Sequence, residues 1–148
     1  MGVVEGGRTE PVDDGWGPVE AVIRLDASRF TADALAGLDG FSHVDVVFVF
    51  HRVPESDVVP GARHPRERAD WPLVGIFAQR GRVRPNRLGV STCSVVRVDV
   101  DGLAVHVRGL DAIDGTPVLD IKPHVPAMGP RGAVRVPPWM DELMSGYW

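Results

Sequence analysis

The apolar residues of this chain form short, valine-rich runs that glycine and proline interrupt at close intervals. Val, Ile and Phe pack well on a pleated sheet, whereas Gly and Pro mark turns and breaks. With 17 glycines and 13 prolines in 148 residues, the pattern predicts a mainly β fold with short helical insertions. The predicted strands are Val19–Leu25, His43–His51, Val74–Gln79, Leu88–Val98, Leu103–Gly109 and Pro117–Lys122.

The alternation of polar and apolar positions is clearest in HVDVVFVFH, residues 43–51. Its even-numbered positions hold only Val and Phe, and its odd-numbered positions hold the polar residues together with two valines. Side chains alternate between the two faces of a strand, so this pattern predicts a central strand with one buried face. In Ser94–Val98 and Leu103–Val107 the alternation is blurred, as expected where a sheet curls and both faces are partly covered.

Two segments predict short helices, and a third predicts a long loop. In residues 31–40, TADALAGLDG, Thr31 is a candidate N-cap and a glycine ends the segment. In residues 137–148, Pro138 suits a first helical turn, and Trp, Leu and Met recur at helical spacing. Residues 52–72 contain four prolines and alternating charge without a period. This composition predicts a loop of the kind that is usually functional or mobile.

The length and charge of the chain limit the possible classes of protein. A chain of 148 residues can bury one core, so we expect a single domain over residues 1–148. A net charge of −4 and a pI near 5.7 argue against a general attraction to nucleic-acid phosphates, so any such contact must be local. No apolar run could span a bilayer, and the N-terminus lacks the pattern of a secretory signal. We therefore expect a cytoplasmic protein.

Several familiar catalytic patterns are missing from the sequence. It contains no G-x-S-x-G, no H-E-x-x-H and no phosphate-binding P-loop motif. The five histidines lack the spacing of metal ligands, and one cysteine cannot build a cysteine-rich zinc site, so we expect no metal. Cys93 lies in an apolar run and is expected to be a small core residue.

The stretch QRGRVRPNRLG, residues 79–89, places four arginines close together in an acidic chain. If the backbone is extended, Arg80, Arg82 and Arg84 project to one side, and Pro85 favours that conformation at the residue before it. These guanidinium groups would repel one another unless they are solvated or paired. Two interpretations stay open: a solvated hairpin loop, or a site for a carboxylate or phosphate.

The segment GLDAIDGTPVLDIKP, residues 109–123, combines a turn with a short strand. Asp114 followed by glycine is a tight-turn signal. In the strand that follows, alternation predicts that Val118, Asp120 and Lys122 share one face. Asp120 and Lys122, the only lysine of the chain, form either a surface ion pair of small energetic value or part of a site.

Three of these segments together resemble the TsaA-like family. They are GFSHVDVVFVFHRV (40–53), GIFAQRGRVRPNRLGVS (75–91) and LDAIDGTPVLDIKPHVP (110–126), and the resemblance extends over residues 2–126. The resemblance implies a small closed or nearly closed β-barrel and a homodimer. It also implies a methyltransferase that uses S-adenosyl-L-methionine to methylate N6-threonylcarbamoyladenosine beside the anticodon of tRNA.

The same resemblance implies a set of site residues. Those implied for the cofactor come from four segments: His51, Arg52, Arg80, Val90, Arg108, Gly109, Leu110 and Asp111. Asn86 and Arg84 are candidates for contacts to the substrate. The methyl acceptor must lose a proton, so Asp114 or Asp120 is a candidate base, with Lys122 tuning the carboxylate.

The sequence departs from the family pattern near both ends. A proline-arginine-glutamine element of the better-known bacterial members is replaced by EPVDDGWG, so we expect Asp13, Asp14 and Trp16 to rebuild that part of the pocket. The C-terminal extension of the longer tRNA enzymes is also missing. Two further hypotheses therefore stay open: a methyltransferase for a small molecule or another substrate, and a noncatalytic module that binds the cofactor.

Overall fold

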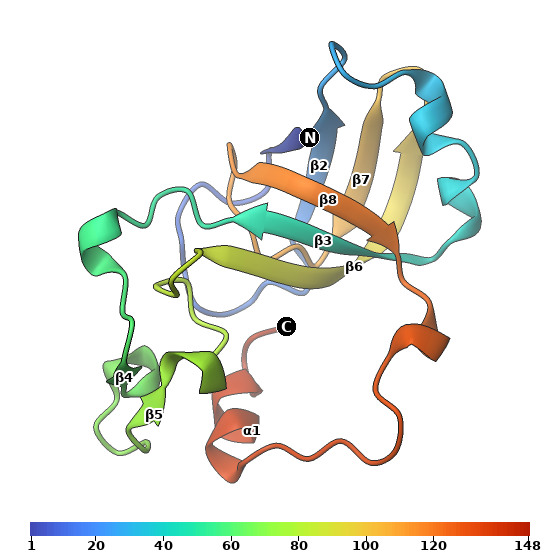
Figure 1. The fold of residues 1–148 in the computed structure, drawn as a ribbon. Helices are drawn as coiled ribbons and strands as arrows, with labels where there is room; N and C mark the ends of the chain where they lie inside the picture. The colour runs from blue at the N-terminus through green and yellow to red at the C-terminus, as the bar shows by residue number, and fades with distance from the viewer.

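The computed structural model describes all residues, 1–148, and its main feature is a closed antiparallel β-barrel (Figure 1). The strand order around the barrel is β1-β2-β7-β6-β3-β8. The barrel strands are β1 (Gly2–Glu5), β2 (Glu20–Leu25), β3 (His43–Val49), β6 (Leu88–Asp99), β7 (Ala104–Arg108) and β8 (Pro117–Pro123). A separate two-stranded sheet pairs β4 (Ala62–Arg63) with β5 (Val74–Gly75), and the one α-helix is α1 (Pro138–Met144). The mainly β fold and the barrel are therefore confirmed.

The barrel interior is filled by every second residue of its strands. On β3, burial alternates along the strand, and Val44, Val46 and Phe48 are fully buried. They join Ile23 of β2, Val105 of β7 and others in one core of 14 buried residues. This arrangement confirms the central strand that was predicted from the alternation in residues 43–51. Because the barrel closes on itself, its sheet has no free edge.

The strand predicted over Val74–Gln79 is wrong beyond Gly75. Only Val74–Gly75 pairs with another strand, and Ile76–Ala78 forms a 3₁₀ turn. The side-chain amide of Gln79 donates hydrogen bonds to the carbonyl oxygens of Arg63 and Val74, each at 3.0 Å. These bonds draw the segment back toward β4 and β5, which an extended strand would not allow.

Strand β8 departs from the alternation that the sequence predicts. A bulge shifts its register against β3, so Phe48 pairs with Val118 while Val47 pairs with Asp120. Val118 is fully buried and Ile121 packs against the core, although they are three residues apart. The prediction that Val118 shares a face with Asp120 and Lys122 is therefore wrong, because one extra residue in a strand reverses the side-chain direction that follows.

The helical predictions are confirmed in part. Residues 31–40 form two 3₁₀ turns, Ala32–Leu35 and Leu38–Gly40, separated by Gly37 with a φ of 81°. Thr31 occupies the cap position but makes no side-chain hydrogen bond there. Helix α1 begins at Pro138 as expected. None of the helices has the length and apolar character needed to cross a bilayer.

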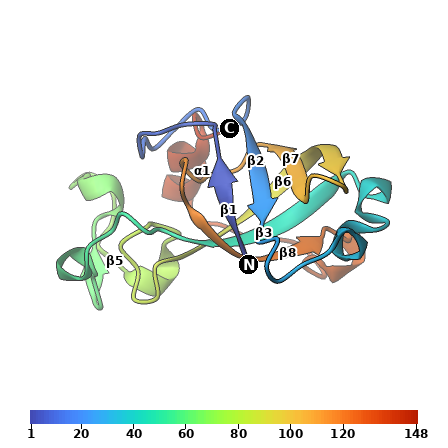
Figure 2. The ribbon, with the colours of Figure 1, turned by 90° about the horizontal axis from the view of Figure 1, so that it is seen from above.

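The N-terminal loop between β1 and β2 meets the C-terminal segment below the barrel. After β8 the chain runs through exposed residues 130–138 to α1, and the C-terminus then turns back toward the barrel (Figure 1). The amides of Gly15 and Trp16 donate hydrogen bonds to the carbonyl oxygens of Gly146 and Tyr147, at 2.9 and 2.8 Å. The segment with β4 and β5 extends to one side of the barrel, as Figure 2 shows. These parts together surround the site described next.

Candidate functional site

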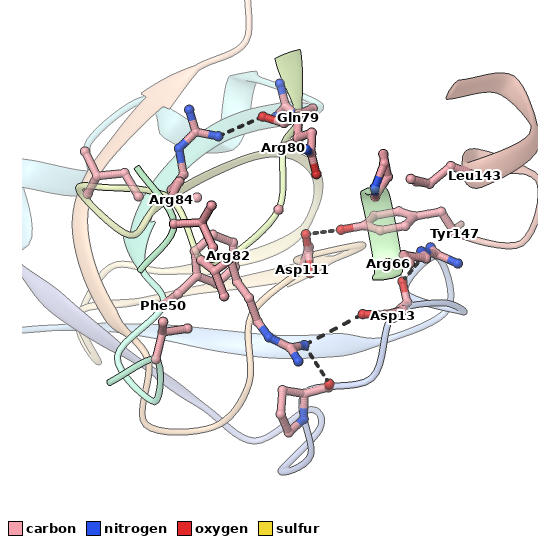
Figure 3. A pocket seen from close by; sticks show the side chains of 18 of the residues that line it. Asp13, Phe50, Arg66, Gln79, Arg80, Arg82, Arg84, Asp111, Leu143 and Tyr147 are labelled. Carbon is pink, nitrogen blue, oxygen red and sulfur yellow. Dashed lines mark hydrogen bonds and ion pairs between the residues drawn. The ribbon is translucent and has the colours of Figure 1, made fainter. Parts of the chain in front are cut away.

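A cavity of about 1620 Å³ lies where the loops between β3 and β6, the N-terminal loop and the C-terminal segment meet. Its lining is mixed, with 19 hydrophobic residues among 41. The charged side chains come mainly from the loops, whereas the large apolar ones come both from α1 with the residues after it and from other parts of the chain, such as Phe48, Phe50 and Phe77 (Figure 3). Cavities with an apolar lining and a few polar groups are the usual form of small-molecule sites.

Asp111 is the least exposed carboxylate in the lining of this cavity. It follows two buried residues after β7, and its Oδ2 accepts a short hydrogen bond from the hydroxyl of Tyr147 (Figure 3). Burial raises the pKa of Asp111 to about 6, while the Tyr147 hydroxyl and the charge of Arg80 act in the opposite direction. A cation or hydrogen-bond donor that enters the cavity would lower the pKa of this carboxyl group, because it would stabilise the ionised form.

Arg80 lies on the loop before β6 and also lines the cavity. Its Nη2 donates a hydrogen bond of 2.7 Å to the carbonyl oxygen of Val90, which fixes the guanidinium beside β6. Val90 is 47% exposed and lines the same cavity. Arg80 and Asp111 therefore place opposite charges on the wall of one cavity, as a zwitterionic ligand requires.

His51 and Arg52 lie just after β3 and also line the cavity. Both are exposed. Arg52 donates from Nη1 to the carbonyl oxygen of Thr9 at 2.9 Å, which ties the end of β3 to the N-terminal loop. His51 lies beside the turn at Gly115. Of the residues predicted for the cofactor, the structure therefore brings His51, Arg52, Arg80, Val90 and Asp111 to one cavity.

The other three residues predicted for the cofactor do not line the cavity. Arg108 points outward and pairs with Glu20 at 2.5 Å. Gly109 is buried with a φ of 81°, and the fully buried Leu110 belongs to the barrel core. A left-handed φ favours glycine, so Gly109 turns the chain and directs Asp111 into the cavity.

The remaining arginines of residues 79–89 hold backbone carbonyls. Arg82 donates to Pro11 at 3.3 Å, Arg84 donates to Gln79 at 3.1 Å, and Arg87 donates to Val53 at 2.9 Å. These residues line or border the cavity and fasten its loops together. Asn86, predicted for the substrate together with Arg84, is exposed and lines the cavity.

The three candidates for proton transfer lie outside the cavity lining. Asp114 is exposed and its Oδ1 accepts a hydrogen bond from the amide of Gly6 at 2.7 Å. Asp120 and Lys122 pair at 2.6 Å on the outer side of β8. Asp120 and Lys122 therefore form the surface ion pair that was one of the two interpretations. Their roles in catalysis stay predictions.

The residues that were expected to replace the missing N-terminal element are distributed differently. Asp13 and the buried Trp16 line the cavity, and Asp13 lies 3.7 Å from Arg82. Asp14 instead forms two hydrogen bonds, at 2.6 and 2.9 Å, with Arg66 of the loop after β4. The N-terminal loop therefore forms part of the cavity wall through two of its three candidates.

Sequence reasoning missed the contribution of the C-terminal segment. Tyr147 is the only tyrosine of the chain, and it stands beside Trp148 close to a helix that carries Trp139. This concentration of aromatic residues was the available signal. Cys93 is fully buried in the barrel core, as expected, and burial raises the pKa of its thiol to about 12. No group of three His, Cys, Asp or Glu side chains is placed to hold a metal ion.

The family model described as "tRNA-methyltransferase O N-terminal domain" matches residues 11–129. A tRNA (adenine(37)-N6)-methyltransferase of Escherichia coli is 41% identical over 106 residues, which are 70% of this chain and 45% of that protein. A probable S-adenosyl-L-methionine-binding protein of Pyrococcus abyssi is 35% identical, over 96% of this chain and 74% of that protein.

Solved structures of TrmO proteins also resemble this chain. A crystal structure of TrmO from Pseudomonas aeruginosa superposes with a TM-score of 0.72 and 28% identity, over 94% of this chain and 59% of that one. This chain spans less than half of the Escherichia coli protein. Because the family model covers most of the chain and the barrel matches in three dimensions, the chain belongs to the family of the tRNA-methyltransferase O N-terminal domain.

Proposed function

We propose that this chain is an S-adenosyl-L-methionine-dependent methyltransferase that N6-methylates N6-threonylcarbamoyladenosine in tRNA. The observation that carries the proposal is the convergence of chain segments that are far apart in sequence. The ends of β3 and β7 and the loop before β6 bring a cationic Arg80 and an anionic Asp111 to one cavity. Family membership supports the same reaction, because relatives bear the name tRNA (adenine(37)-N6)-methyltransferase.

The charges in the cavity fit the proposed cofactor. Its amino-acid tail has a carboxylate that suits the guanidinium of Arg80, and its amine and ribose hydroxyls suit the carboxylate of Asp111. The apolar side chains of the C-terminal segment offer a surface for an adenine ring. Bound there, the cofactor would supply an electrophilic methyl group. We infer that the chain contributes mainly by holding the reactants in line and by excluding water.

The acceptor nitrogen also has to lose a proton, and the candidates for that step are less well placed. Asp114, Asp120 and Lys122 lie outside the cavity lining of the single chain; Asp114 and Lys122 are exposed and Asp120 is half-buried. We infer that any role for them in proton transfer requires a second subunit of the predicted homodimer. Exposed apolar side chains supply surface for such a partner, since Val90 at the cavity and Leu119 on β8 are each 47% exposed.

The proposed contact to tRNA is local. The chain carries a net charge of −4, and the arginines closest to the cavity are bound to backbone carbonyls. A small set of contacts at the rim, including Asn86, would therefore have to select the modified base. The cytoplasmic location expected from the sequence agrees with a tRNA substrate and stays a prediction.

The first test is binding. The melting temperature of the purified chain is measured with S-adenosylmethionine, S-adenosylhomocysteine, ATP and NAD. A ligand that binds only the folded state raises this temperature, so only the first two should do so. No response to either of them would overturn the proposal.

The second test is transfer. The chain is incubated with labelled cofactor and total tRNA from a strain that lacks its own methyltransferase. Incorporation of label into this tRNA, and none into fully methylated tRNA, is the expected result. Binding without transfer to tRNA but with transfer to a small-molecule extract would favour the second hypothesis. Binding without transfer to any extract would favour a noncatalytic module.

A further inference from the structure

The C-terminal segment, residues 138–148, forms one wall of the cavity. Its side chains that line the cavity are mostly apolar or aromatic: Trp139, Met140, Leu143, Met144, Tyr147 and Trp148. The segment is held in place at two points. Glu142 accepts hydrogen bonds from Arg68 and from Nε1 of Trp71, each at 3.0 Å. The backbone of its last residues pairs with the N-terminal loop.

Close approach of the backbones explains why the second contact is so tight. A Cβ atom on Gly17 would lie 2.7 Å from the carbonyl carbon of Trp148, so only glycine allows this approach. The side chain of Trp148 also reaches the turn at Gly109. The end of the chain is therefore fixed next to the residues that direct Asp111 into the cavity.

Within this wall, Tyr147 is the residue that contacts a charged group of the cavity. Its hydroxyl donates to Oδ2 of Asp111 (Figure 3), which is the one side-chain hydrogen bond that the Asp111 carboxylate makes, so Oδ1 is left free. The charged and titratable groups around the pair are Arg80, Asp13, Arg66 and Cys93. Burial and the neighbouring carboxylate raise the pKa of Tyr147, so the phenol keeps its proton and stays a donor.

We propose that Tyr147 is a positioning residue of the cofactor pocket, which fixes the Asp111 carboxylate so that Oδ1 faces the ligand. The inference rests on the proposed function, because it assumes that the ligand of Asp111 is the cofactor. Because Oδ1 of Asp111 is free to bind a ligand, we infer that Tyr147 orients the carboxylate. A tyrosine that blocked the site would be expected to occupy the oxygen that the ligand binds. A hydrogen bond to one oxygen of a carboxylate fixes the side-chain rotamer, and the other oxygen can still accept a hydrogen bond from a ligand.

The test compares the parent chain with Tyr147→Phe, which removes only the hydroxyl. S-adenosylhomocysteine is the probe, and its dissociation constant is measured by calorimetry from pH 5 to pH 8. Loss of a charge-assisted hydrogen bond should weaken binding about fivefold to tenfold near neutral pH. The pKa of the Asp111 carboxyl, followed by NMR without ligand, should rise in the variant because the carboxylate loses a donor.

Glu142→Gln provides the matched control. It weakens the contacts with Arg68 and Trp71, which hold the same segment, and it leaves the Tyr147 hydroxyl and Asp111 in place. The control should keep the parent's Asp111 pKa. Circular dichroism of each variant verifies that the barrel is folded.

Three results would overturn the proposal. They are an unchanged affinity with an unchanged Asp111 pKa in Tyr147→Phe, a tighter affinity in that variant, or the same pKa change in Glu142→Gln. Failure of the parent chain to bind S-adenosylhomocysteine would instead count against the proposed function. In that case the NMR titration still decides whether Tyr147 holds Asp111.

Discussion

The barrel and the segments around the cavity are stabilised in different ways. In the barrel, 14 buried side chains form one continuous apolar core. In residues 50–87, only Val53, Pro65, Trp71, Ile76 and Gln79 are buried. There the chain is held instead by guanidinium groups on backbone carbonyls, from Arg52, Arg80, Arg82, Arg84 and Arg87. The barrel is thus a rigid frame, and the pocket depends on a few specific polar contacts.

Removing apolar volume from the frame should have the largest effect on stability. Ile23 of β2 is fully buried in the core and does not line the cavity. Ile23→Ala should lower the free energy of unfolding by about 2–5 kcal/mol, because the barrel cannot close around the lost volume. Chemical denaturation measures this loss. Ile23→Val, the matched control, should cost about 0.5–1.5 kcal/mol, and equal effects of the two would contradict a tightly packed core.

Removing a guanidinium group from the cavity should affect ligand binding more than stability. Arg80→Ala should weaken the binding of S-adenosylhomocysteine by about 1.5–3 kcal/mol, the usual value of a hydrogen bond to a charged group. Arg87, whose Nη1 is bound to Val53, provides the comparison. Calorimetry on Arg87→Ala should show a much smaller change. Equal losses in the two variants would show that the loops act as a unit and that Arg80 has no separate role.

The buried carboxyl group predicts a pH effect with a definite sign. Folding raises the pKa of Asp111 from 3.8 to about 6, so the native state binds a proton that the unfolded chain has already lost. This contribution favours folding below pH 4 and is lost as the pH rises through 6. Relative to Asp111→Asn, whose amide oxygen still accepts from Tyr147, the parent should lose about 1–3 kcal/mol of stability between pH 4 and pH 7. Parallel stability curves for the two proteins would contradict this assignment.

Features that depend on one local segment could be predicted from the sequence, and features that depend on pairing between distant segments could not. The strand at residues 43–51 follows from local alternation, since its burial depends on the period of side chains along one segment. The bulge in β8 does not, because an inserted residue becomes visible only when Phe48 pairs with Val118. The short β1 was missed because four residues, Gly2–Glu5, give too little pattern. It exists through pairing with β2 and β8.

The residues of the cavity also differ in how far they could be predicted from the sequence. His51, Arg80, Val90 and Asp111 could be named from their motifs, and they lie together at the cavity. Tyr147 could not be named, because its role depends on the return of the C-terminal segment across a long, exposed connection. The local sequence of residues 130–138 does not predict to which part of the barrel this connection leads the C-terminal segment. Contacts between distant segments, which create this pocket, are the part that single-sequence reasoning does not reach.

The smallest expected effect concerns the outer side of the barrel. Asp120 and Lys122 form an exposed pair at 2.6 Å, and the lysine lowers the pKa of the carboxyl group. Exposed pairs of this kind contribute about 0–1 kcal/mol, so Lys122→Ala should leave the free energy of unfolding nearly unchanged. The rate of methyl transfer then becomes an informative measurement. An unchanged rate would assign the pair to the surface alone, whereas a large loss in a stable, dimeric variant would show that a second subunit brings β8 to the reaction.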